Sequence, residues 1–150
     1  MSKFGSFFQT KENKGTDALT IENEAEACAA VLMACRRADE IDGGGGNAVF
    51  MATLQNRNIF IGSDPAELIE KAAQYFEQAG SSETLINAAM PAIRQQTRLP
   101  LFYQCLDVIL ADGVVTPKED KIFKYLIGKF KVNKDLAFQA LEVLLVKNQL

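Results

Sequence analysis

The feature that most constrains this fold is the stretch Leu106–Leu126, which has the pattern of a helix, a short acidic turn and a second helix. Gly113 can adopt the left-handed conformation that ends a helix without a Cβ clash. Thr116 precedes Pro117, and proline is favoured at the first helical position. Glu119 stands three residues after Thr116, which is the spacing of a capping box. These signals predict two helices joined by a short, stiff turn.

The same turn is a candidate cation site. Asp112 and Glu119 lie at its two ends, with the Thr116 hydroxyl and several backbone carbonyls between them. Such oxygen atoms are the ligands that Ca²⁺, Mg²⁺ and Mn²⁺ prefer. Geometry alone favours a purely structural turn, because Thr116 and Glu119 act as caps and Asp112 can accept hydrogen bonds from backbone N–H groups.

The helical spacing before the turn predicts where Asp112 points. Asp112 continues the apolar series Leu101, Cys105 and Val108 at intervals of four, three and four residues. We therefore expect its side chain to face the core. A carboxylate in the core requires a cation, a set of hydrogen-bond donors or a raised pKa, because burial of a bare charge is very costly.

Composition bounds the function. A chain of 150 residues suits one domain with a sizeable core. Its net charge of −3 argues against nucleic acid as the main partner. The absence of histidine removes Ser-His-Asp and Cys-His catalysis, and two to four carboxylates alone are a thin catalytic inventory, so we expect no enzymatic activity. No apolar run approaches the roughly 20 residues of a membrane-spanning helix, and Met1–Gly15 lacks the apolar core of a signal peptide.

The cysteines are expected to be structural. Cys28, Cys35 and Cys105 are odd in number and all lie in apolar helical patterns. Cys28 and Cys35 would stand about 10 Å apart on one helix, which is too far for a disulfide. Buried free thiols in a reducing compartment are therefore the expectation.

Read in order, the chain predicts an all-α fold of about seven helices. Residues 1–20 show no sustained period and are expected to form a flexible N-terminal arm, which leaves residues 21–150 for the helical domain. The tract Gly43–Gly46 is expected to form a flexible loop that interrupts the helical pattern, because glycine carries a large entropic cost in a helix. Pro91 is expected to kink or stop a helix. The predicted helices span about 21–38, 47–56, 65–78, 81–94, 100–111, 117–130 and 133–147, the last being a packed terminal helix.

An internal duplication emerges when the chain is shifted by 73 residues. Cys28, Leu32, Cys35 and Asp39 then align with Leu101, Cys105, Val108 and Asp112. A helix pair of this size buries its own apolar face poorly. We therefore expect two pseudo-symmetric helical bundles, packed together and related by the duplication.

The chain resembles the tellurite-resistance TerB family, whose hallmark is two copies of an Ala-Asp-Gly-x-Ile/Val-x-x-x-Glu turn in an all-helical fold. The second copy is residues 111–119, Ala-Asp-Gly-Val-Val-Thr-Pro-Lys-Glu. The first copy, which begins at Ala38-Asp39, lacks the glycine after Asp39 and has a glycine at the position of the glutamate. The resemblance spans roughly residues 21–147.

The resemblance implies a non-enzymatic stress-response module of the cytoplasm, with other stress-response proteins as partners at the inner membrane surface. It also implies a site for Ca²⁺ or another divalent cation such as Mg²⁺ or Mn²⁺, and no organic cofactor. Carried over by position, the ligands are Asp39, Asp112 and Glu119, with Asp42 as a local replacement for the lost glutamate. The alternative is a purely structural interaction domain without a metal site, whose function lies on an exposed helix face.

Overall fold

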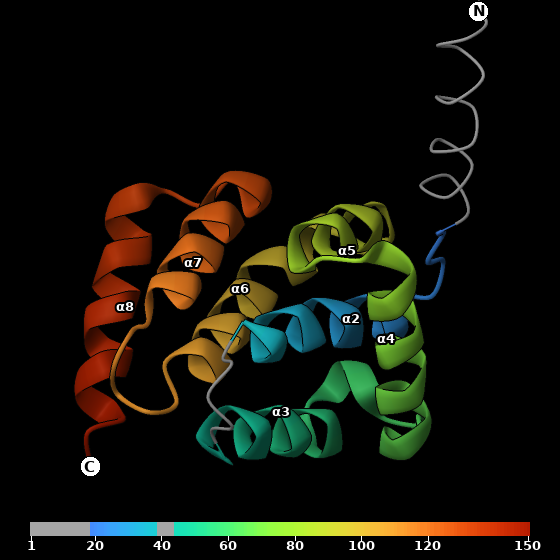
Figure 1. Ribbon diagram of the computed structural model, residues 1–150, viewed down its shortest axis with the longest axis horizontal. Coiled ribbons are helices and arrows are strands. Elements are labelled where there is room, and N and C mark those ends of the chain that lie inside the picture. The colour runs from blue at the N-terminus through green and yellow to red at the C-terminus, as the bar shows by residue number, and fades with distance from the viewer. Residues whose placement is uncertain (1–18, 39–43) are drawn as a thin grey trace, which may run out of the picture.

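The computed structural model describes residues 19–38 and 44–150, and within this part of the chain all regular structure is helical. Two single-turn 3-10 helices, Asn58–Phe60 and Met90–Ala92, accompany seven α-helices (Figure 1). The α-helices are α2 (Glu24–Arg37), α3 (Gly44–Asn56), α4 (Pro65–Ala79), α5 (Ser82–Ala89), α6 (Gln95–Ile109), α7 (Pro117–Phe130) and α8 (Lys134–Lys147). The prediction of an all-α fold with about seven helices is confirmed.

Side-chain caps set most of the helix starts. Asp64 Oδ1 accepts a hydrogen bond from the backbone N–H of Ala66 at 3.1 Å. The side chains of Ser81 and Asn133 each accept a hydrogen bond from the backbone N–H three residues further on, in α5 and α8 respectively, at 3.1 Å. Gly80, with a φ of 84°, ends α4 in the left-handed conformation. These boundaries agree with the predicted ones because a cap is a local signal.

Two boundaries differ from the prediction. Helix α6 begins at Gln95 and contains Pro100, where we expected the proline to start it. Pro100 removes one backbone N–H from the helix, and the burial of the neighbouring Leu101 and Phe102 offsets that loss. Pro91 does stop α5 early, because α5 gives way to a 3-10 turn at Met90.

The glycine tract is also partly helical. Helix α2 ends before it, as predicted, but Gly44 begins α3. Glycine in a helix costs roughly 0.5–1 kcal/mol relative to alanine. The burial of Phe50 and Leu54 on α3 offsets this cost. The glycine tract was expected to be a loop along its whole length, but from Gly44 onward it belongs to α3.

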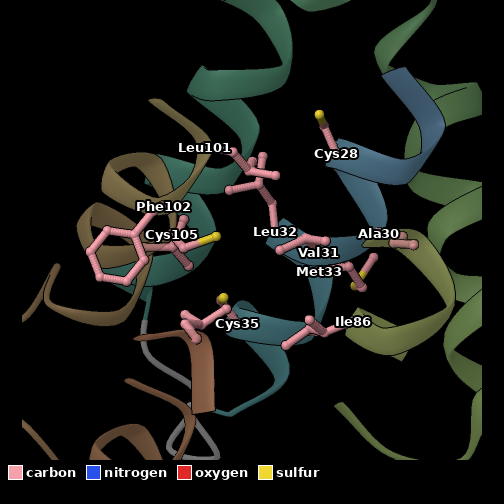
Figure 2. Packing of buried hydrophobic residues seen from close by; sticks show 14 of the residues in the cluster. Cys28, Ala30, Val31, Leu32, Met33, Cys35, Ile86, Leu101, Phe102 and Cys105 are labelled. Carbon is pink, nitrogen blue, oxygen red and sulfur yellow. The ribbon is translucent and has the colours of Figure 1, made fainter. Parts of the chain in front are cut away.

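Helix α2 forms the centre of the molecule. Nine consecutive residues, Ala27–Cys35, are buried, so the helix is covered on every side. Helices α3, α4, α5 and α6 pack around it, as Figure 1 shows. Figure 2 shows Leu32 and Cys35 directed toward α6, and Ala30 and Met33 toward the α5 side. Four alanines in this run let the neighbouring helices approach closely.

Helices α7 and α8 extend the fold on the far side of α6 (Figure 1). Phe102 of α6 packs against Phe123 and Phe130 of α7, with ring centroids 6.5 and 6.1 Å apart. Phe138 of α8 meets the Phe123 ring edge-on at 5.4 Å. This cluster of rings joins the last three helices.

Two further predictions fall on the limits of the described residues. Nearly all of the expected arm, residues 1–20, lies outside them, but Leu19 packs against the core and Ile21 is buried. The helix pairs α2/α3 and α6/α7 each pack together. The internal duplication and its pseudo-symmetry stay predictions.

Candidate functional site

The corner between α6 and α7 carries the acidic motif. Helix α6 ends at Ile109, and Leu110 donates its backbone N–H to Leu106 O at 2.8 Å. The chain then turns through Gly113, which has a φ of 77° and donates to Leu110 O at 3.0 Å. A side chain is strained in that conformation, which explains the glycine.

The second half of the corner is a complete capping box. Thr116 Oγ1 accepts from Glu119 N at 3.2 Å, and Glu119 Oε1 accepts from Thr116 N at 3.0 Å. Only 1% of Glu119 is exposed to solvent. One of the predicted metal ligands is thus a buried carboxylate that holds the start of α7.

Asp112 corrects our expectation. Its side chain is exposed to solvent and does not face the core. The helical spacing that placed it inward applies only as far as Ile109, where α6 ends. Beyond that residue the backbone turns, and the periodicity of the helix no longer decides which way a side chain points.

The end of α8 is fastened to this corner. Asn148 Nδ2 donates to Leu110 O at 2.9 Å, and Lys147 Nζ lies 3.3 Å from Asp107 Oδ1. A Cβ added to Gly113 would meet the carbonyl oxygen of Asn148 at 3.2 Å. The corner therefore positions α8 as well as α7.

The described residues do not by themselves assemble a cation site at this corner. Within residues 19–38 and 44–150, no three cysteine, aspartate or glutamate side chains come together as metal ligands would. Asp39 and Asp42 lie outside the described residues. Asp112 and Glu119 alone fall short of the six or more oxygen ligands that Ca²⁺ takes.

The outer face of α8 is the feature that sequence reasoning missed. We expected a packed terminal helix, but Ala137 is its only buried residue. Val143 and Val146 are each 64% exposed, and Leu136 and Leu150 are exposed as well. Within α8, Leu136, Gln139, Val143 and Val146 recur at intervals of three and four residues along one face, and Leu150 follows beyond the end of the helix. That 3-4 spacing, characteristic of helix-pairing seams, was readable in the sequence.

A groove lies beside this face, between α6 and α8. Its volume is about 390 Å³. Its walls are formed by Tyr103, Gln104 and Asp107 of α6 and by Leu136, Gln139, Ala140, Val143 and Leu144 of α8. Helix α8, which carries the stripe and one wall of the groove, lies at the opposite end of the molecule from α4 (Figure 1).

The cysteines are buried free thiols, as predicted. Figure 2 shows Cys35 and Cys105 on facing sides of the contact between α2 and α6. Burial raises the pKa of Cys105, and the nearby Cys35 and Cys28 raise it further. Burial likewise raises the pKa of Cys28 to about 12. Thiols in this state are poor nucleophiles.

Comparison with known proteins identifies one relationship. The family model described as "Tellurite resistance protein TerB" matches residues 25–141, which include α2 through most of α8. No curated protein matches the chain, and neither does any solved structure. Among the described residues, no helix is long and apolar enough to cross a membrane.

Proposed function

Because the chain belongs to the TerB family of tellurite-resistance proteins, we propose that it acts as a non-enzymatic module of a resistance system and docks a protein partner on the outer face of α8. The observation that carries this proposal is the exposed stripe of Leu136, Val143 and Val146 on α8. Contiguous exposed apolar surface of this kind marks interaction sites in soluble proteins.

The spacing of the stripe favours a helix as the bound element. Leu136, Gln139, Val143 and Val146 of α8 are separated by three, four and three residues. A seam with this period packs against another helix by knobs-into-holes contacts. The neighbouring groove between α6 and α8 offers room for the side chains of such a helix.

Charge along the stripe favours a basic partner. Asp135 and Glu142 are both exposed and stand seven residues apart, so they border the stripe on the same edge. Lys147, the basic residue near the stripe, is already paired with Asp107. We therefore infer that the partner presents an amphipathic helix with an apolar stripe and lysine or arginine beside it.

The cellular setting of this proposal comes from the family resemblance. We propose that the module acts in the cytoplasm, with other stress-response proteins as partners at the inner membrane surface, as that resemblance implies. The capped corner between α6 and α7 then has a supporting role, because it fixes the position of α8 through Asn148 and Lys147. A divalent-cation role for that corner remains a separate prediction.

The proposal is tested by complementation. A host strain that lacks its own copy of the gene is grown on potassium tellurite and supplied with the wild-type chain or with Val143→Glu/Val146→Glu. We expect the wild type to restore growth and the double variant to fail, while its thermal melt stays close to that of the wild type, since both positions are largely exposed.

Ile61→Glu is the matched control. Ile61 is an apolar residue with 77% exposure that lies in the turn before α4, away from α8. This variant is expected to protect the host as well as the wild type does. If the double variant protected the host as well as the wild type does, α8 would not be the docking face. If the wild-type chain gave no better growth on tellurite than the empty host, the proposed function would be contradicted.

A further inference from the structure

A second cavity, which meets the α8 groove at Gln104, lies between α2, α3 and α6. Its volume is about 260 Å³. The buried side chains of Cys28, Leu32, Phe60 and Leu101 form its base. Figure 2 shows Cys28 and Leu101 on opposite sides of this space, with Leu32 beside them. The base is therefore almost entirely apolar.

The mouth of the cavity is polar. Arg57 and Asn58, which follow the end of α3, line the cavity and are exposed to solvent. With the Gln104 amide assigned so that its oxygen faces the guanidinium, the orientation that satisfies both of its polar atoms, Arg57 Nε and Nη2 donate to that oxygen at 3.0 and 3.2 Å. The Gln104 amide nitrogen donates in turn to Thr53 Oγ1 at 3.3 Å, and the Thr53 hydroxyl donates to Val49 O at 2.8 Å.

Among the described residues, this chain of hydrogen bonds gives the Arg57 guanidinium a neutral partner, the Gln104 amide, at the mouth of an apolar cavity. The ion pairs among the described residues involve other cations, so no described carboxylate neutralises Arg57. The two N–H groups that face the Gln104 oxygen have the fork geometry that suits a carboxylate. An incoming anion could replace the weaker amide oxygen.

We propose that the cavity between α2, α3 and α6 binds a small monocarboxylic acid, with its apolar body against Leu32, Phe60 and Leu101 and its carboxylate on Arg57. One cation at the mouth matches one negative charge. The cavity volume of about 260 Å³ lies below the roughly 300–1,000 Å³ of pockets that take drug-sized ligands, which favours a small ligand.

The binding is non-covalent. Cys28 faces the cavity, but it is 1% exposed, and its burial disfavours the thiolate that a covalent step would need. The thiol contributes apolar surface. Its position is useful for a test, because a larger apolar side chain at residue 28 would occupy the space of the ligand.

The experiment is a titration followed by ¹H–¹⁵N correlation spectra. The probes are sodium hexanoate and 1-hexanol, which share a six-carbon body and differ in charge. We expect hexanoate to give saturable shifts at the amides of Arg57, Phe60 and Leu101. Arg57→Gln should weaken hexanoate binding about tenfold or more, since a charge-assisted pair is lost, and should change hexanol binding less than about twofold.

Two further variants make the result decisive. Cys28→Leu should weaken both probes, because it fills the cavity, and Arg37→Gln should weaken neither, because Arg37 stacks on Phe76 and does not line this cavity. Unsaturable shifts, shifts confined to other parts of the protein, or equal hexanoate affinity in wild type and Arg57→Gln would each overturn the proposal.

Discussion

Glu24 ties the first turn of α2 to the start of α6. Its Oε2 accepts the backbone N–H of Arg94 and its Oε1 accepts Arg94 Nε, both at 2.9 Å. Burial pushes the pKa of Glu24 upward, but the hydrogen bonds from Arg94 and Thr97 and the charge of Arg94 outweigh it. The net effect is a pKa below the ordinary value for glutamate.

This lowered pKa predicts how stability depends on pH. A carboxylate with a lower pKa in the folded state stabilises the fold above its unfolded pKa, and it loses that contribution as pH falls through the folded pKa. We expect Glu24→Gln to lower the free energy of unfolding by about 1 kcal/mol at pH 7. The difference from wild type should shrink in acid, where Glu24 is protonated. Urea unfolding at a series of pH values measures it.

Glu22→Gln is the control for this series, because Glu22 is exposed and precedes the helix. It should show little effect at any pH. A Glu24→Gln penalty of constant size from neutral to acidic pH would contradict the role assigned to its carboxylate.

For single residues, the sequence predicts those side-chain contacts that are set by neighbours within a few positions along the chain. The cap at Thr116 and the partner glutamate three positions later form as expected, because both lie within one turn of helix. The side-chain direction of Asp112 could not be predicted in the same way. It depends on where α6 ends, and that is decided by Gly113 and by the packing of Asn148 against the turn.

At the scale of elements, Gly113 couples the corner to α8. Its φ of 77° already disfavours any side chain, and a Cβ would also press on Asn148 and Gln149. Gly80 has a similar φ of 84° but nothing within 4 Å of the added atom. Comparing alanine substitutions at the two glycines therefore distinguishes the effect of backbone strain, which both share, from the effect of contact with the end of α8, which only Gly113 has.

We expect Gly80→Ala to destabilise the protein by about 1 kcal/mol and Gly113→Ala by clearly more, since only the second adds a steric clash to the left-handed strain. Amide hydrogen exchange should show that Gly113→Ala also increases exchange at the end of α8. Equal losses of stability for the two variants would mean that the turn does not press on α8.

The cation prediction belongs to the same element. EDTA-treated protein is melted alone and with millimolar Ca²⁺, Mg²⁺ or Mn²⁺, with Asp112→Asn alongside. A cation that binds only the folded state stabilises it by about 2.7 kcal/mol at a hundredfold excess over its dissociation constant. We expect the midpoint to rise in the wild type and not in Asp112→Asn. No rise with any of the three cations would leave the turn as a capped corner.

For the whole molecule, the sequence predicts the positions of the helices better than it predicts which faces of each helix are covered by other helices. Periodicity identified α8 as apolar, yet it could not show that only one side of α8 is covered, because the covering elements, α6 and α7, meet it through tertiary packing. The cavity is a similar case. Cys28, Arg57 and Gln104 come from distant parts of the chain, and no local pattern links them.

The complete burial of α2 has a consequence for how the protein is made. During synthesis α2 emerges before α5 and α6, which cover two of its sides and follow more than 40 residues later. Until then the nascent chain carries an apolar helix with uncovered faces, and exposed surface of this kind promotes aggregation. We therefore expect the core around α2 to form only after α6 has left the ribosome. The interval between the emergence of α2 and that of α6 is the period in which a chaperone would act.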